Sequence, residues 1–360
     1  MILRRTLSSL GGLLCWLAAS VPTLAHAEAP RYHVLRETPA VGPELVILRD
    51  EKAGVEAAVA PDFGAELTGL RCRFRGEWVE LLYRARDYSP TDGWRGKAPI
   101  LWPAVARNFP KDVKFDLKRQ DCVYDYAGKR YTIPISGFVR EMPWTVVRLA
   151  ADDDSALLEL EVRDTAETRA QYPFAFRLRV TYRLAGGRLE MLHAVQSDEG
   201  NAAPMFFSIG NHITFRTPLI DGSPLEQVLM QTPSTIEYLK DATTLPTGDK
   251  QPLSYVEPVG IADLKAVPAI SLGGYTGDAW LRLVDPAGLA VRLSHHAESL
   301  PAEPLVQFNV WGRPRDGYLS PEPIVGLQNS LNLQQGLIEL PAGRTWSWWL
   351  WIDLERMPLR

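Results

Sequence analysis

The chain has 360 residues, of which 46% are apolar and 23% charged, proportions that are typical of an ordinary globular protein. Its formal net charge of −4 argues against the basic surface of a nucleic-acid-binding protein and against a polybasic tract for anionic lipid. Eleven tryptophans suit a wide β core.

The N-terminus has the pattern of a secretory signal peptide. Two arginines at positions 4 and 5 precede an apolar run over residues 7–24, and Ala-His-Ala at 25–27 is a cleavage site of the A-x-A type. Gly, Ser and Pro interrupt the run, which disfavours a membrane anchor. We therefore predict a signal peptide over residues 1–27 and a mature protein that is periplasmic or secreted, without membrane attachment after cleavage.

Two cysteines, Cys72 and Cys122, remain after that cleavage. In an oxidising compartment a pair can form a disulfide, but the sequence does not fix the distance between them. A bridge and two thiols both stay open. Neither cysteine has neighbours at metal-ligand spacing, so we predict no metal site.

The predicted strands are short and follow one another with turns between them. Residues 172–182 alternate strictly between apolar and polar side chains, a hairpin turn follows at 185–188, and residues 188–195 return. Residues 87–98 are rich in turn formers and are predicted as a loop, and residues 218–268 are predicted as a loop-rich stretch. Further strands are predicted at 46–48, 55–60, 67–74, 78–83, 156–162, 279–284, 290–294, 305–311 and 345–352.

Amphipathic helices are scarce in this pattern, and no linker or internal repeat divides the chain. The strand spacing predicts an all-β protein, a large antiparallel β-sandwich that forms a single domain over residues 28–360.

One histidine stands apart from the others. His212 follows Gly210 and Asn211, which we interpret as a tight turn at the end of a strand, where a rigid sheet presents side chains to a cleft. By contrast, His295 and His296 are adjacent, so their rings would face opposite sides of a strand and could not bind a metal together. A structural role for His212 remains the alternative.

One carboxylate also stands apart. Glu322 lies between Pro321 and Pro323, which fix the backbone on both sides of a predicted loop. The chain shows no nucleophile elbow, P-loop or dinucleotide fingerprint. Imidazole and carboxylate remain, and they are suited to proton transfer without a cofactor. The alternative for Glu322 is a solvated loop carboxylate.

In order along the mature chain, several segments resemble the aldose 1-epimerase (galactose mutarotase) family. His212 ends the segment that resembles the strand of the family's catalytic histidine, and Glu322 begins the segment that resembles its catalytic-glutamate loop. The further matching segments are residues 64–70 with 78–83, 99–108, 137–144 and 172–176.

The resemblance implies a galactose mutarotase-like β-supersandwich with few short helices, a free sugar as substrate and no cofactor. Glu322 would take the proton from the anomeric hydroxyl, and His212 would protonate the ring oxygen. The resemblance also predicts the residues that contact the sugar, and several of them follow predicted strand segments. They are Arg107, Asn108, Arg140, Asn211, Asp278 and Trp311.

The chain departs from the family's pattern at Ser136, where the family usually has a histidine that helps to hold the sugar. The family's further acidic ligand has no clear match in a motif, and we assign this position to Asp278. The departure at Ser136 favours the alternative of a non-catalytic carbohydrate-binding protein on the same fold. A phosphosugar mutarotase and a polysaccharide lyase or hydrolase are further alternatives.

Overall fold

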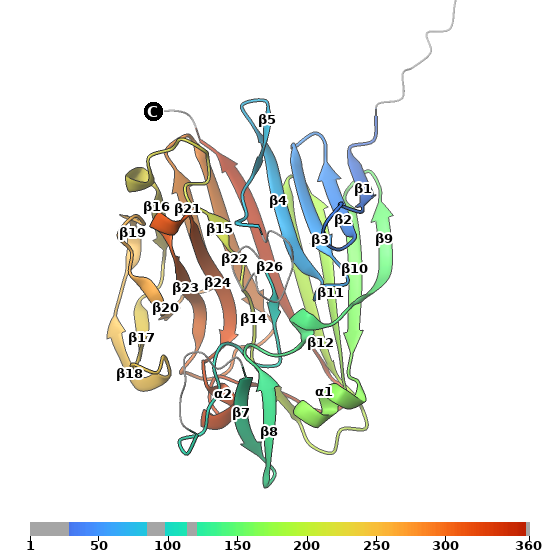
Figure 1. The fold of residues 1–360 in the computed structure, drawn as a ribbon, viewed down its shortest axis with the longest axis vertical. Helices are drawn as coiled ribbons and strands as arrows, with labels where there is room; N and C mark the ends of the chain where they lie inside the picture. Colours follow the sequence, from blue (N-terminus) through green and yellow to red (C-terminus); the bar gives the residue numbers. More distant parts are fainter. Residues whose placement is uncertain (1–28, 85–97, 114–120, 358–360) are drawn as a thin grey trace, which may run out of the picture. The chain divides into compact units, whose positions relative to one another are not determined.

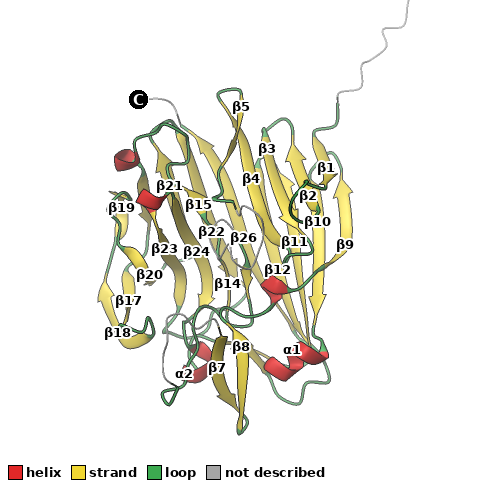
Figure 2. Ribbon diagram, in the orientation of Figure 1, coloured by secondary structure: helices red, strands yellow, loops and turns green. Residues whose placement is uncertain are grey.

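The computed structural model describes residues 29–84, 98–113 and 121–357. The chain divides into Met1–Pro30 and Arg31–Arg360, and the second unit is described below. The predicted signal peptide and nearly all of the predicted loop at 87–98 lie outside the described residues. Strands dominate the second unit (Figure 2), and the prediction of an all-β fold is confirmed.

Three large antiparallel sheets make up most of this unit. The first contains the strands in chain order, as β1-β2-β3-β4-β5. Its strands are β1 (Tyr32–Glu37), β2 (Leu45–Asp50), β3 (Val55–Ala60), β4 (Glu66–Phe74) and β5 (Glu77–Glu80).

The second sheet has nine strands in the order β19-β16-β21-β22-β26-β12-β11-β10-β9. Its strands are β9 (Thr145–Ala151), β10 (Ala156–Arg163), β11 (Phe176–Ala185), β12 (Arg188–Ser197), β16 (Leu229–Thr232), β19 (Tyr255–Gly260), β21 (Ala279–Asp285), β22 (Leu289–Ala297) and β26 (Thr345–Arg356).

The third sheet has the order β18-β17-β20-β23-β24-β14-β6, and β15 also pairs with β24. Its strands are β6 (Ile100–Leu101), β14 (Ile209–Asn211), β15 (Phe215–Arg216), β17 (Ile236–Lys240), β18 (Pro246–Pro252), β20 (Ala266–Gly273), β23 (Val306–Arg313) and β24 (Tyr318–Gly326).

The remaining elements are short. Two small sheets pair β7 (Asp121–Tyr126) with β8 (Lys129–Pro134) and β13 (Met205–Phe207) with β25 (Ile338–Leu340). The helical elements are α1 (Ala166–Gln171), α2 (Ser330–Leu333), η2 (Val139–Glu141), η3 (Leu225–Gln227) and η4 (Pro314–Asp316). None of the helices in the described part of the chain has the length and apolar character to span a membrane.

The first and third sheets both pack against the nine-stranded sheet (Figure 1). Tyr182 on β11 donates a hydrogen bond of 2.6 Å to the carbonyl of Ala65, beside the first sheet. His295 on β22 packs its ring against Phe308 of β23, with 5.1 Å between the ring centroids. The core therefore lies between the sheets, and burial alternates along β11 with the two-residue period of a strand.

The region 218–268 was predicted as a loop-rich stretch, and its strands were not predicted. It contains β16, β17, β18, β19 and the start of β20. The reason lies in sheet position, because β18 and β19 are the edge strands of their sheets and expose most of their side chains. Edge strands carry polar residues and proline, so they lack the apolar alternation by which strands are recognised.

The predicted strand 172–182 begins later than expected. Residues 166–171 form α1, and β11 starts at Phe176. The hairpin that follows matches the prediction, since Ala185 pairs with Arg188. Cys72 and Cys122 are both buried thiols rather than a disulfide, and burial raises the pKa of Cys72 to about 11.

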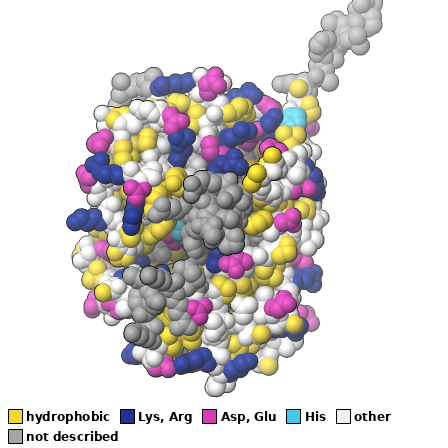
Figure 3. All heavy atoms as spheres, in the orientation of Figure 1, with side chains coloured by type: hydrophobic (Ala, Val, Ile, Leu, Met, Phe, Trp, Pro, Cys, Tyr) yellow, Lys and Arg dark blue, Asp and Glu magenta, His cyan; other side chains and the backbone are white. Residues whose placement is uncertain are grey.

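Charges of both signs are interspersed over the face of the molecule shown in Figure 3. Two histidines, by contrast, are buried in the core, where His193 and His295 pack against Trp348. Trp348 donates from Nε1 to Nδ1 of His295 at 3.1 Å, and Nε2 of His295 donates to the carbonyl of Gln307 at 2.8 Å. These contacts suit a neutral ring. Burial lowers the pKa of each histidine to about 4.

Acid should therefore destabilise the fold through these two groups. Each histidine has a pKa of about 4 in the folded protein and 6.5 in the unfolded chain. Its neutral form therefore contributes fully to the free energy of unfolding above pH 6.5, and this contribution is lost as the pH falls towards 4. Between pH 7 and pH 5 we expect the free energy of unfolding to fall by on the order of 2 kcal/mol per histidine. Urea unfolding at the two pH values measures it.

His193→Leu should reduce this pH dependence, because one titrating group is removed. His296→Asn is the matched control, since His296 is exposed. Equal pH dependence in wild type and His193→Leu would contradict the assignment.

Candidate active site

Glu322 lies in the middle of β24, and the prediction of a loop at this position was wrong. On one side β24 pairs with β23 along its length. On its other side β15 pairs up to Leu319 and β14 pairs from Ile324. Pro321 and Pro323 fall within this interruption, where a residue without an N–H group is tolerated in a strand. The prolines therefore mark a gap in the sheet.

His212 lies at this interruption. Gly210 and Asn211 belong to β14 rather than to the predicted turn, and His212 follows directly. Its backbone N–H donates to the carbonyl of Pro99 at 3.0 Å. A side chain at Gly210 would press on the side chain of Ile324 at 3.0 Å, so glycine lets β14 approach β24 closely.

The gap brings the two predicted catalytic side chains into contact. Nε2 of His212 lies 3.3 Å from Oε1 of Glu322. Both residues are buried, with 7% and 6% of their surfaces exposed. An imidazole and a carboxylate in contact in a largely water-free setting can exchange protons with a bound molecule.

Two hydroxyl groups hold the other ring nitrogen of His212. The Oγ1 atom of Thr214 and the Oγ atom of Ser320 each lie 3.3 Å from Nδ1, and the two hydroxyls are hydrogen-bonded to each other. Trp311 on β23 packs edge-on against the imidazole, with 5.3 Å between the ring centroids. A hydroxyl can donate or accept, so this environment is compatible with both protonation states of the ring.

A hydrogen-bond relay fixes Glu322 from the side of β23. Ser271 donates to Oδ1 of Asn309 at 2.6 Å. The amide of Asn309 also bonds to Glu322, and with its oxygen engaged it must donate to the carboxylate from Nδ2. Sequence reasoning missed both residues. They are register partners on neighbouring strands, a relation that no motif in the sequence reveals.

Burial raises the pKa of Glu322 above the ordinary range of a glutamate. The positive charges of His212 and Lys240 and the hydrogen bond from Asn309 oppose this rise. A carboxylate that keeps its charge in a buried position needs such partners. Its raised pKa makes the ionised form a better proton acceptor than a solvated glutamate.

Arg107 and Asn108 connect this region to the segment that follows β24. The N–H of Asn329 donates to the carbonyl of Arg107 at 2.9 Å, and the N–H of Leu331 donates to Oδ1 of Asn108 at 3.1 Å. Nδ2 of Asn108 donates to the carbonyl of Val105 at 3.4 Å. Asn108 is almost fully buried, so its amide fastens two segments together, and the contact with sugar predicted for it has no support in these bonds.

Ser136 is also engaged in structure. Its Oγ accepts a hydrogen bond of 3.0 Å from the N–H of Ala106, and its own N–H donates to the carbonyl of Ala106 at 3.2 Å. These bonds join the segment before Arg107 to the segment before Arg140. Burial lowers the pKa of Arg140, which also forms an ion pair of 2.6 Å with Glu141.

Two further residues were predicted to contact the sugar, and the structure places them differently. Asn211 directly precedes His212 at the end of β14, and its buried amide has no hydrogen-bond partner among the described residues. Asp278 precedes β21 of the nine-stranded sheet, where it forms an ion pair of 2.7 Å with the exposed His296. The His212–Glu322 pair belongs to the third sheet, so the described contacts do not bring Asp278 to it. Trp311, also a predicted sugar contact, packs directly on His212.

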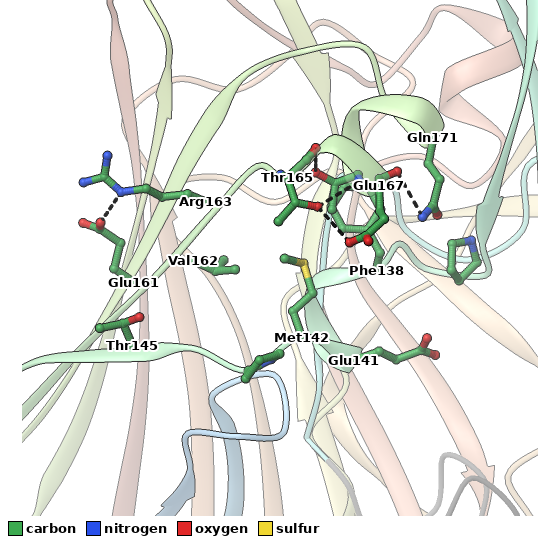
Figure 4. A pocket seen from close by; sticks show the side chains of 13 residues that line it. Phe138, Glu141, Met142, Thr145, Glu161, Val162, Arg163, Thr165, Glu167 and Gln171 are labelled. Atoms are coloured by element: carbon green, nitrogen blue, oxygen red, sulfur yellow. Dashed lines mark hydrogen bonds and ion pairs between the residues drawn. The ribbon is translucent and has the colours of Figure 1, made fainter.

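A separate surface pocket of about 770 Å³ lies beside α1 and η2 (Figure 4). Phe138, Met142 and Val162 contribute apolar walls, and Glu161 is paired with Arg163 at its side. None of the predicted site residues lines this pocket. In the described residues, no group of three or more His, Cys, Asp or Glu side chains is arranged to hold a metal ion.

The family model described as aldose 1-epimerase matches residues 46–260, which is more than half of the chain. The chain therefore belongs to the aldose 1-epimerase family. The matched range contains His212 and ends before Glu322, so the pairing of these two residues rests on the geometry.

Solved structures share the fold. A galactose mutarotase-like protein from Clostridium acetobutylicum is 20% identical, with 91% of this chain and 99% of that chain covered and a TM-score of 0.72. A galactose 1-epimerase from Lactobacillus acidophilus NCFM is 15% identical, with 92% of this chain and 100% of that chain covered and a TM-score of 0.64. The prediction of a galactose mutarotase-like fold is confirmed.

The close approach of the strands around the pair can be tested at Gly326 of β24. A Cβ atom there would collide with the Cβ of Ser208. We expect Gly326→Ala to lower the free energy of unfolding by about 1–3 kcal/mol, as for overpacked cores. Gly260→Ala is the matched control, because its nearest neighbour lies at 3.9 Å, and it should change stability by less than about 0.5 kcal/mol. Equal effects in urea unfolding would contradict this packing.

Proposed function

We propose that this protein is an exported aldose 1-epimerase that interconverts the α and β anomers of a free aldose, with Glu322 as base and His212 as acid. The contact of 3.3 Å between Nε2 of His212 and Oε1 of Glu322 carries the proposal. Membership of the aldose 1-epimerase family supports the reaction class.

The geometry suits the reaction because the anomeric hydroxyl and the ring oxygen of an aldose are bonded to the same carbon. An acid and a base that serve both oxygens must therefore lie side by side. Ionised Glu322 accepts the anomeric proton, protonated His212 donates to the ring oxygen, and the bond from the anomeric carbon to the ring oxygen breaks. The products are an open-chain aldehyde, a neutral imidazole and a carboxylic acid.

Ring closure reverses these transfers after the aldehyde rotates. The hydroxyl that attacks the other face of the carbonyl returns its proton to His212, and Glu322 returns its proton to the carbonyl oxygen. Both residues regain their starting states, so the cycle needs no cofactor. Ser320 and Thr214 hold Nδ1 of His212 and thereby orient Nε2 towards the sugar through both steps.

The proposed substrate is a free sugar outside the cytoplasm, because the N-terminal sequence has the pattern of an export signal. A second candidate is a non-catalytic carbohydrate-binding protein. Ser136 favours it, since a side chain fastened to the backbone of Ala106 replaces the sugar-holding histidine that the family resemblance leads one to expect.

An anomer-exchange assay separates the two candidates. Wild-type protein should accelerate the exchange of glucose, galactose or a pentose, measured by NMR or polarimetry. His212→Asn and Glu322→Gln should each slow it at least about a hundredfold, in line with the loss of general acid or base catalysis. His296→Asn and Glu339→Gln change exposed residues of the same types and should leave the rate unchanged.

Saturable sugar binding without acceleration on any sugar tried would support the binding protein instead. An unchanged rate in His212→Asn would remove this residue from the mechanism.

The pH dependence gives a further test. Since burial raises the pKa of Glu322, the base loses its charge as the pH falls through a value above the ordinary glutamate range. The acid limb of kcat/KM should therefore lie above that range. An acid limb at the position of a solvated glutamate would contradict the buried base.

A further inference from the structure

Lys240 is a charged residue on the same sheet as the pair, and neither the mechanism above nor any sequence motif uses it. It ends β17, and its Nζ reaches the carbonyl of Ala269, beside β17 on strand β20, at 2.8 Å. The strands β17, β20, β23 and β24 are consecutive in this sheet, as Figure 1 shows. A lysine on the first of them can therefore face a carboxylate on the last only across β20 and β23.

The register shows that these residues share one face of the sheet. Tyr238 pairs with Ser271, Ser271 with Asn309, and Asn309 with Glu322. Directly paired residues point to the same side, and residues two apart along a strand do so as well. Lys240 lies two residues beyond Tyr238. The register shift between them adds residues to β18 and leaves this spacing on β17 intact, so Lys240 is on the side of the sheet that carries Glu322.

The electrostatics agree with this placement. Burial lowers the pKa of Lys240 to about 8, and Glu322 is the leading group that opposes this shift, followed by Glu237. The charges that act on Glu322 come from His212, at the end of β14, and from Lys240, while Asn309 on β23 adds its hydrogen bond. Lys240 and Glu322 thus stabilise each other's charged forms.

We infer that Lys240 is a positioning residue for the acid–base pair, which holds Glu322 in its ionised form at neutral pH. The inference rests on the proposed function for its catalytic meaning. In the proposed step His212 and Glu322 lose their charges together, so Lys240 acts on the carboxylate in the resting state, before the anomeric proton is taken. The hydrogen bond to the carbonyl of Ala269 holds the ammonium group of Lys240 in place.

The direct test is the carboxyl titration of Glu322, followed by ¹³C NMR in protein with labelled glutamate. The resonance is assigned by its loss in Glu322→Gln. Lys240→Met should raise the titration midpoint by about one pH unit, the lower end of the effect of a nearby opposite charge. Lys240→Arg, which keeps the charge, should restore the midpoint towards the wild-type value.

Lys250→Met is the matched control, because Lys250 is exposed and paired with Glu303. It should leave the midpoint unchanged. An unchanged midpoint in folded Lys240→Met would overturn the inference.

Kinetics give a second readout. In Lys240→Met the acid limb of the anomer-exchange rate should move up by the same pH interval. The rate on that limb should then fall about tenfold for one unit and recover at higher pH. A loss of rate that is equal at every pH would show a merely structural role and would overturn the inference.

The reverse measurement holds even if Lys240→Met does not fold. By linkage, Glu322→Gln must lower the pKa of Lys240 if the two charges are coupled, and ¹⁵N NMR of labelled lysine measures it. An unchanged Lys240 titration in Glu322→Gln would overturn the inference. The two NMR titrations need no sugar, so wild type that exchanges no anomers would defeat the proposed function while the coupling of Lys240 to Glu322 is still decided.

Discussion

The candidate site depends on one interruption in β-sheet pairing. β24 is paired with β15 up to Leu319 and with β14 from Ile324, and the backbone between them carries Glu322. An uninterrupted neighbour strand would fill this position with its own backbone. Because the neighbour is broken between Asn211 and Phe215, the imidazole of His212 occupies the gap and meets the carboxylate. Glu322 lies within β24 and His212 directly follows β14, so the positions of these two strands set the geometry of the pair.

A buried carboxylate in that gap needs surrounding residues that stabilise its negative charge. Removing an ionised group from water is strongly unfavourable unless charges and hydrogen bonds compensate. Glu322 receives this compensation from three directions, namely His212 at the end of β14, Asn309 on β23 and Lys240 on β17. Each comes from a different strand, so the charge of the base depends on the whole third sheet and not on the local motif alone.

The sequence predicted those parts of the fold in which one face of a strand is buried and the other is wet. The hairpin of β11 and β12 follows its alternating pattern closely, because burial on one side imposes a two-residue period. The polar edge strands β18 and β19 were missed, since water on most sides removes that period. Their strand character comes from pairing with a neighbour, which a single segment does not encode.

At the candidate site, too, the sequence predicted local features but not those that depend on the pairing of strands. Pro321 and Pro323 correctly indicated a constrained backbone around Glu322, yet that constraint is a gap in a sheet and not a loop. Asn108 lies in a segment that the resemblance singled out and Ser136 directly precedes another, but their side chains fasten backbones together. Lys240 and Ser271 could not be predicted from the sequence, because only the register of four strands places them on the same face of the sheet as Glu322.

The most direct test of the central claim is a crystal structure of Glu322→Gln with a bound aldose. We predict that the anomeric oxygen lies within hydrogen-bond distance of the side chain at position 322 and that the ring oxygen lies within the same reach of Nε2 of His212. A sugar bound away from the gap between β14 and β15, or one that turns a different edge towards the pair, would contradict the account.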